Sequence, residues 1–116
     1  MEEHVRLAGQ QANPYSLMRA GEVFVQSSRI EAFGLTIIEA MILGKPVIST
    51  RTDGGLELLQ DEQFGLLCDA SEASIAEAVE TMLVSPDVRD RFAQRLEDHD
   101  FDAMNETVME RLYQVL

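Results

Sequence analysis

The sequence predicts an α/β fold with a mostly parallel sheet, and three observations support this prediction. Short apolar runs of strand composition alternate with segments of helical periodicity, as in strands joined by helical crossovers. The chain has 116 residues, 46% of them hydrophobic, which is enough for one core but not for two. All seven glycines precede residue 70, which indicates that the loops lie in this part of the chain, and we expect the functional site among them. We therefore expect residues 1–116 to form a single domain.

Four short runs have the composition of strands, and helical patterns lie between or after them. The expected strands are residues 5–8, 23–26, 47–50 and 65–68. Parallel strands need long crossover connections, which are usually helices that cover the faces of the sheet. The prediction is therefore a Rossmann-like three-layer fragment with about four strands flanked by helices.

Capping residues mark the helices of the first half. Asn13 can cap a short helix that has Pro14 at its first position, and Gly21 can end that helix in the left-handed conformation. Gly44 ends the helix that contains IIEAMIL, and Pro46 then allows a strand to begin. A turn at residues 53–55 opens a further short helix.

The second half is predicted to be mostly helical. Ser71 caps one helix and Ser85-Pro86 starts another. The first of these helices has an apolar stripe of Ile75, Ala78, Val79, Met82 and Leu83. A last helix is expected from the stripe of Phe101, Met104, Val108, Leu112 and Val115. Residues 71–116 contain eleven acids and four arginines, which indicates that these helices have a solvated outer surface.

Charge and composition exclude several classes of protein. A net charge of −12 argues against binding to nucleic acid or to anionic lipid. No apolar run approaches the roughly 20 residues of a membrane span, and MEEHVR lacks the apolar core of a secretion signal. We expect a cytoplasmic chain without a membrane span. Cys68 has no partner cysteine and ends an apolar run, which predicts a buried thiol; His4 and His99 are expected on the surface.

The segment EAFGLTIIEAM, residues 31–41, is where we expect the chemistry. If residues 23–26 form a strand and 34–43 a helix, the loop between them lies at the carboxyl end of the strand, where ligands bind in open α/β sheets. Gly34 would start the helix with its own N–H and those of Leu35 and Thr36 open to solvent. Together with the helix dipole, these groups can bind a phosphate.

Two glutamates flank this helix start. Glu39 lies about 7–8 Å along the helix, a distance that suits a ribose attached to the phosphate. Its carboxylate can accept hydrogen bonds from two vicinal hydroxyls, and Glu31 can meet hydroxyls beyond the phosphates. Each also has a structural explanation, Glu31 as a favourable acid at a helix N-terminus and Glu39 as a solvent-facing residue. The apolar neighbours of Glu39 favour the ligand role, because a buried acid needs a partner.

The run NPYSLMRAGEVFVQSSRIEAFGLTIIEAMILGKPVISTRTDGGLELL, residues 13–59, resembles the C-terminal donor-binding domain of family-4 (group 1) glycosyltransferases. These are retaining enzymes of GT-B fold. The most specific element is the E-x(7)-E pair within S-x-x-E-x-F-G-L-x-x-x-E-A, followed by G-K-P-V and the D-G-G turn. The resemblance extends over nearly the whole chain.

The resemblance implies transfer of a hexosyl unit from a nucleoside diphosphate sugar to an acceptor hydroxyl with retention of configuration, without a metal or another cofactor. It implies that Glu39 holds the ribose and that Glu31, the catalytic candidate, contacts the sugar near the reacting centre. The other donor-binding residues that it implies are Phe33, Gly34, Leu35 and Thr36 for the diphosphate, and Gln10 and Gln11 for the nucleobase.

The chain departs from the family pattern by being short. Family members have an N-terminal acceptor-binding domain and a basic pair that binds the diphosphate, and both are missing here. Arg29 and Arg51 are the bases near the expected cleft, and either can replace that pair in part; the alternative is that both are ordinary surface residues. We therefore expect a partial donor-binding domain that binds donor weakly and is inactive by itself. The alternative is a non-catalytic nucleotide-binding or regulatory module, or a subunit that pairs with a separate acceptor-binding domain.

The family's strand order, 3-2-1-4-5-6, raises a question about residues 5–8, which match strand 3. The remaining predicted strands match strands 4, 5 and 6, so both sheet neighbours of residues 5–8 are missing. Unpaired backbone groups need new partners. We expect residues 5–8 to pair directly beside residues 23–26, or two copies of the chain to complement each other as a homodimer.

Overall fold

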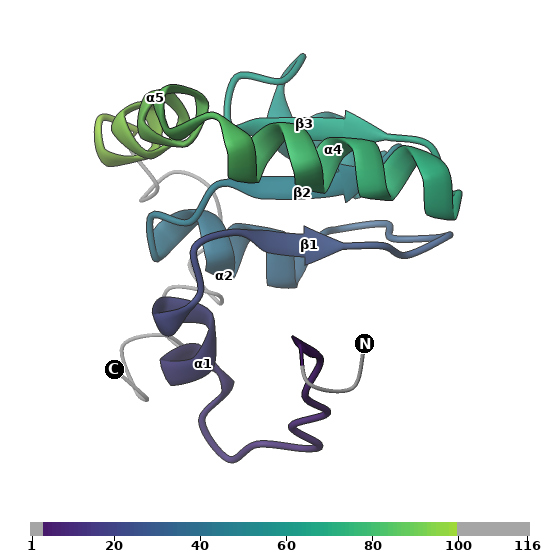
Figure 1. Cartoon of the computed structure of the whole chain (residues 1–116), viewed down its shortest axis with the longest axis vertical. Helices are drawn as coiled ribbons and strands as arrows, with labels where there is room; N and C mark the ends of the chain where they lie inside the picture. Colours follow the sequence, from purple (N-terminus) through teal and green to yellow (C-terminus); the bar gives the residue numbers. More distant parts are fainter. Residues whose placement is uncertain (1–3, 100–116) are drawn as a thin grey trace.

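A computed structural model describes residues 4–99 and has an α/β architecture (Figure 1). Strands β1 (Phe24–Gln26), β2 (Val47–Thr50) and β3 (Gly65–Cys68) form a parallel sheet in the order β1-β2-β3. The register pairs Phe24 with Val47 and Thr50 with Cys68. The predicted parallel α/β fold is confirmed.

Five helices flank this sheet in the described part of the chain. They are α1 (Pro14–Ala20), α2 (Leu35–Ile42), α3 (Asp53–Leu59), α4 (Glu72–Val84) and α5 (Pro86–Glu97). No helix within residues 4–99 is both long enough and apolar enough to cross a bilayer.

Two hydrophobic clusters lie on opposite faces of β2. Val47 packs in one cluster with side chains of α1, α2 and α3, whereas Ile48 packs in the other with side chains of α4. Successive side chains of a strand point to opposite faces, so two neighbouring β2 residues anchor both layers. Helix α5 contributes to both clusters, because Phe92 belongs to the second cluster and Leu96 to the first.

The predicted helix caps are largely confirmed. The Asn13 side chain accepts from the Tyr15 amide, and the Ser71 side chain accepts from the Ser74 amide. Ser85 precedes α5 as expected, with Pro86 at the first helical position. Gly44 follows α2 with a φ of +77°, the left-handed conformation that glycine adopts most cheaply. Each of these helices therefore begins or ends where local chemistry indicates.

Three expectations are wrong or fall outside the described residues. Residues 5–8 form no strand and pair with neither β1 nor any other described strand, so the sheet has three strands rather than about four. An isolated apolar run cannot become a strand without a neighbour that takes its backbone hydrogen bonds. Gly21 ends α1 with extended backbone (φ −76°), not left-handed backbone. The helix expected over residues 101–115 lies outside the described residues.

The close contact between β2 and β3 leads to a first prediction. A Cβ on Gly65 would lie 2.0 Å from the carbonyl oxygen of Val47. We expect Gly65→Ala to lower the free energy of unfolding by about 1–3 kcal/mol, because backbone atoms must move apart. Urea unfolding would measure this change. Gly21→Ala is the matched control, since its Cβ would have no neighbour nearer than 3.7 Å. Equal unfolding midpoints for the two variants would contradict the prediction.

Candidate functional site

A pocket of about 200 Å³ lies where the loops after β1 and β2 meet. Both loops leave the carboxyl ends of adjacent parallel strands, the edge at which ligands bind in open α/β sheets. The residues that line the pocket are Arg29, Ile30, Glu31, Ala32, Arg51, Thr52 and Asp53. Glu31 and both expected arginines are therefore brought together at this edge.

Polar side chains at the ends of β1 and β2 hold the first loop. Thr50 is buried, and its hydroxyl donates to the backbone carbonyl of Ser28. The side-chain amide of Gln26 donates to the Ser28 hydroxyl, and its oxygen accepts from the Thr36 hydroxyl at 2.9 Å. These bonds connect β1, the loop and the first turn of α2. Sequence analysis missed the role of Gln26 and Thr50, although a polar residue that ends each apolar strand was a visible signal.

The same loop rests on the first turn of α3. The Gly54 amide donates to the Glu31 carbonyl at 2.7 Å. A Cβ on residue 54 would lie 2.9 Å from both the Glu31 carbonyl oxygen and the Gly34 nitrogen. The D-G-G turn opens a helix as expected, and its first glycine lets the loop approach the helix backbone.

Glu31 bonds to Gly34, the residue that precedes the first turn of α2. Its Oε1 accepts from the Gly34 amide at 3.1 Å, while its side chain also borders the pocket. Gly34 has a φ of +69° and is buried beneath α3, since a Cβ there would lie 2.6 Å from Leu58 Cδ1. The expectation that the Gly34 amide is open is therefore wrong. The exposed part of the first turn is formed by Leu35 and Thr36, whose amides have no acceptor earlier in the helix.

Glu39 lies inside the protein. Its side chain is only 4% exposed, so the explanation of Glu39 as a solvent-facing residue is wrong. It does not line the pocket that contains Glu31. Leu35 precedes it by four residues and therefore lies on the same face of α2, and helical side chains lean toward the N-terminus.

The remaining expected donor-binding residues lie apart from the pocket lining. Phe33 is 78% exposed next to Gly34. Gln10 and Gln11 are exposed in the N-terminal segment, where the Gln11 side chain donates to the Ala8 carbonyl at 2.7 Å. Arg51 borders the pocket but forms an exposed ion pair with Asp69. Exposed pairs of this kind are weak, so the arginine can exchange its partner at little cost.

Cys68 is buried at the end of β3, as the sequence predicted. Burial raises the pKa of the Cys68 thiol above its ordinary value, although the nearby Arg51 opposes the change. The thiol therefore stays protonated at neutral pH. A protonated, buried thiol is a poor nucleophile.

Comparison with known proteins then decides the family. A family model described as "Glycosyl transferases group 1" matches residues 1–99. The chain belongs to the group 1 glycosyltransferases. One relative of this glycosyltransferase chain is LpsE of Rhizobium meliloti, a lipopolysaccharide core biosynthesis glycosyltransferase. The two sequences are 37% identical over 92 residues, which cover 78% of this chain and 27% of LpsE. Sucrose synthase of Nitrosomonas europaea is 40% identical over 77 residues, which cover 62% of this chain and 10% of that enzyme.

A solved structure extends the comparison to the fold. HepE of Anabaena, solved in complex with UDP, superposes with a TM-score of 0.79 at 27% identity and covers 97% of this chain. The match includes 33% of the HepE chain, so this glycosyltransferase chain spans about a third or less of the length of these relatives. Its structural neighbours are GT-B glycosyltransferases, which confirms the GT-B assignment.

The hydroxyl of Thr50 supplies a prediction about the loop. Thr50→Val leaves the half-buried Ser28 carbonyl without its donor, so we expect the free energy of unfolding to fall by about 1–3 kcal/mol. The loop should also loosen, and hydrogen exchange at the Gly54 amide should become faster. Thr81→Val is the matched control, because that exposed hydroxyl bonds only to the Glu77 carbonyl of its own helix. Unchanged exchange at Gly54 in the Thr50 variant would show that the hydroxyl does not hold the loop.

Proposed function

We propose that this chain binds the nucleoside diphosphate sugar for a retaining glycosyltransferase that moves a hexosyl unit to an acceptor hydroxyl in the cytoplasm. One observation carries the proposal: Glu31 lies at once in the pocket of the carboxyl edge and at the start of α2. The match to HepE, solved with UDP, supports a nucleotide as the ligand.

The first turn of α2 receives the diphosphate in this proposal. The amides of Leu35 and Thr36 offer hydrogen-bond donors at the positive end of the helix dipole. The Gly34 amide becomes available only when Glu31 leaves it, because its bond at 3.1 Å occupies that group. A phosphate that takes this amide releases the Glu31 carboxylate toward the sugar. Donor binding and the placement of Glu31 are therefore coupled.

Glu39 receives the ribose hydroxyls in this proposal. Its carboxylate shares a helix face with Leu35, one turn nearer the helix start. Because only 4% of the residue is exposed, ribose binding requires a rearrangement that uncovers the carboxylate. Gln10 and Gln11 approach the nucleobase from the N-terminal segment.

The proposal assigns catalysis to the complete enzyme and not to this chain alone. The acceptor is bound by a separate N-terminal domain or subunit. Arg29 and Arg51 are the two bases that line the pocket of the described chain, and they offset only part of the repulsion between a diphosphate and a net charge of −12. No metal or other cofactor is assigned a role. Donor binding by the isolated chain is expected to be weak and its transfer activity absent.

A nuclear magnetic resonance titration with UDP, GDP and ADP tests the donor role. We expect one nucleotide to shift the amide signals of Leu35 and Thr36. Glu39→Gln should weaken that binding about tenfold or more, because it removes a charged acceptor for the ribose hydroxyls. Glu80→Gln, an exposed acid of α4, is the matched control. Equal binding by wild type and Glu39→Gln would remove the ribose role, and no shift with any nucleotide would overturn the donor role.

The role of Glu31 is tested by comparing a nucleotide with the corresponding nucleotide sugar. In the wild type we expect the nucleotide sugar to bind more tightly, because the released carboxylate contacts its hydroxyls. Glu31→Ala should remove that difference while binding of the nucleotide itself is kept or strengthened, since the Gly34 amide is then free. Isothermal titration of both ligands measures the two affinities. A difference that persists in Glu31→Ala would exclude contact between Glu31 and the sugar.

A further inference from the structure

Helix α2 begins without a capping side chain. The residue at its N-cap is Gly34, and no side-chain hydrogen bond caps the helix from that position. A serine, asparagine or aspartate there would accept a hydrogen bond from an amide of the first turn, which stabilises a helix. The same bond would occupy an amide that can otherwise bind a phosphate. Glycine therefore leaves these amides open but contributes no bond that fixes the turn.

A side chain of the neighbouring strand holds this turn instead. Gln26 is the last residue of β1, and its Oε1 accepts a hydrogen bond from the Thr36 hydroxyl at 2.9 Å. Thr36 is the second residue of α2. The bond uses the hydroxyl of Thr36 and leaves the backbone amides of Leu35 and Thr36 out of it. Gln26 thus holds the first turn without occupying the groups that the proposed site offers to a diphosphate.

The same side chain also holds the loop that contains Glu31. Gln26 Nε2 donates to the Ser28 hydroxyl at 2.5 Å. The Ser28 carbonyl accepts from Thr50, and the Glu31 carbonyl accepts from the Gly54 amide at 2.7 Å. Because a glutamine carries both an acceptor oxygen and a donor nitrogen, a single side chain connects the loop to the helix.

The position of Gln26 in the strand supports a specific role. Phe24, two residues earlier, packs against the hydrophobic cluster that contains α2 side chains. Alternate residues of a strand share a face, so Gln26 also lies on the α2 side. A polar group on such a face is unfavourable unless it is hydrogen-bonded, and Gln26 is half-buried with both ends of its amide bonded. All of these contacts lie inside the described chain and involve no open edge of the sheet.

We propose that Gln26 is a positioning residue of the donor site, which fixes the first turn of α2 and the Glu31 loop relative to each other. The inference rests on the proposed function, in which the turn receives the diphosphate and Glu31 meets the sugar. Gln26 is assigned no contact with the donor. Its bond to Thr36 acts on binding of the diphosphate, and its bond to Ser28 acts on the placement of Glu31.

Substitutions of Gln26 and Thr36 test the bond to the helix. Gln26→Met has a similar length but makes neither bond, and Thr36→Val removes only the hydroxyl. We expect each to weaken binding of whichever nucleotide binds among UDP, GDP and ADP about three- to tenfold, the effect of one lost hydrogen bond. The double variant should bind no more weakly than Gln26→Met, because both changes remove the same bond. Thr36→Ser should recover the affinity that Thr36→Val loses.

Ser28→Ala tests the bond to the loop. It removes the hydroxyl that Gln26 bonds and keeps the carbonyl that Thr50 bonds. We expect it to lower the preference for the nucleotide sugar over the nucleotide, because Glu31 is then less firmly placed. Its effect on the affinity for the nucleotide should be smaller than that of Gln26→Met. Isothermal titration with both ligands measures the two quantities.

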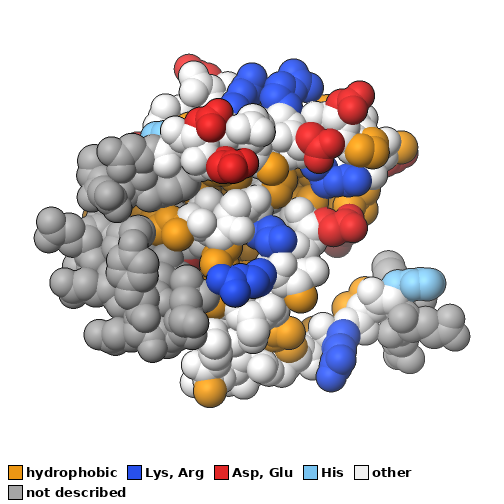
Figure 2. All heavy atoms as spheres, turned by 90° about the vertical axis from the view of Figure 1, so that its left-hand side faces the viewer, with side chains coloured by type: hydrophobic (Ala, Val, Ile, Leu, Met, Phe, Trp, Pro, Cys, Tyr) orange, Lys and Arg blue, Asp and Glu red, His pale blue; other side chains and the backbone are white. Residues whose placement is uncertain are grey.

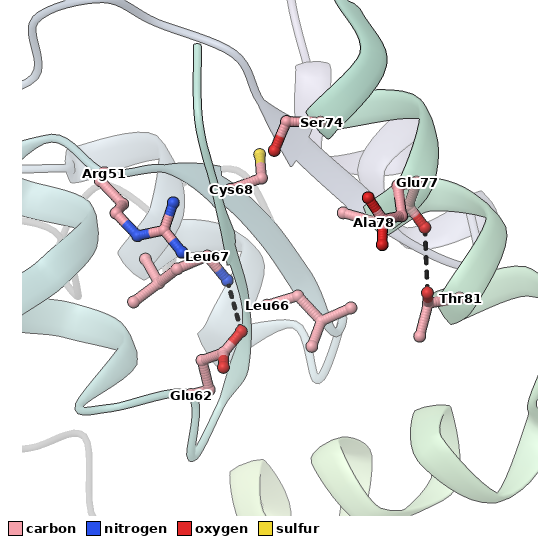
Figure 3. Close-up of a pocket in the computed structure, with 9 residues that line it drawn as sticks. All are labelled: Arg51, Glu62, Leu66, Leu67, Cys68, Ser74, Glu77, Ala78 and Thr81. Carbon is pink, nitrogen blue, oxygen red and sulfur yellow. Dashed lines mark hydrogen bonds between the residues drawn. The ribbon is translucent and has the colours of Figure 1, made fainter. Parts of the chain in front are cut away.

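Two variants away from the site are matched controls. Thr81→Val removes an exposed hydroxyl of α4 that donates to the Glu77 carbonyl at 3.0 Å, a bond drawn in Figure 3. Gln94→Met removes an amide of α5 that donates to the Asp98 carboxylate. Helix α5 lies at the amino ends of the strands in Figure 1, on the side that Figure 2 shows. Acidic and basic side chains are interspersed on that face, and neither control changes a charge. Both should bind nucleotide as the wild type does.

Hydrogen exchange gives a readout that needs no nucleotide. The Ile38 amide closes the first turn of α2 by donating to the Gly34 carbonyl at 3.0 Å. Its exchange should be faster in Gln26→Met than in the wild type and in both controls. If Gln26→Met does not fold, the pair Thr36→Val and Thr36→Ser keeps the test, because Thr36 is exposed.

The outcomes separate this proposal from the donor role. Equal nucleotide affinity in the wild type and Gln26→Met, unchanged exchange at Ile38, or a Thr36→Ser variant that recovers no affinity would each overturn the positioning role and leave the donor role intact. A folded wild type that binds none of the three nucleotides would overturn the donor role and the positioning role together.

Discussion

The central strand β2 is the constraint on which the rest of the structure depends. All four of its residues are at most 2% exposed, and β1 and β3 pair with its two sides. Because β2 is enclosed, two positions elsewhere in the chain have no space for a side chain and are occupied by glycine. A Cβ on Gly65 would meet the Val47 carbonyl oxygen at 2.0 Å, and one on Gly55 would meet the Ser49 hydroxyl at 2.3 Å. Close approach to a fully enclosed strand leaves no room for a side chain at either position.

Burial of β2 also has a chemical consequence at its carboxyl end. A buried hydroxyl needs a hydrogen-bond partner, and Thr50 finds one in the Ser28 carbonyl of the loop that precedes α2, with a longer bond to the Gln26 carbonyl at the end of β1. The loop thereby becomes part of the framework, although it lies at the edge where ligands bind. Within the loop, the Glu31 side chain accepts the hydrogen bond of the Gly34 amide. The diphosphate of the proposed donor would have to take the place of the Glu31 carboxylate at this amide.

The predictable parts of this structure depend on local signals, and the unpredicted parts depend on contacts distant in sequence. The strands at 47–50 and 65–68 occur with the predicted bounds, because runs of apolar residues between turns specify them locally. Asn13 and Ser71 cap helices through bonds to amides two and three residues away. Residues 5–8 have the same local signature as a strand but form none, because pairing requires a neighbour.

The same distinction applies to the candidate site. The predicted strand at residues 23–26 and helix at residues 34–43 correctly indicated a loop at the carboxyl end of β1, and the apolar neighbours of Glu39 correctly indicated its burial. No local pattern indicated that Leu58 of α3 would cover Gly34, or that Gly54 would support the loop. Both facts depend on how α3 packs beside α2.

The distribution of charge changes how the net value of −12 bears on an anionic ligand. Taken as a single number, it opposes binding of a diphosphate. Most of the acids follow residue 50, however, while the first fifty residues, which include the loop and α2, are nearly neutral. Exposed charges separated by more than about 8–10 Å are largely screened at physiological ionic strength. The local field at the pocket is therefore determined chiefly by Arg29, Arg51, Glu31 and Asp53, which line it, and by Asp69, which pairs with Arg51. A diphosphate bound there, as proposed, would also have to displace Glu31 from the Gly34 amide, a local cost that the overall charge does not describe.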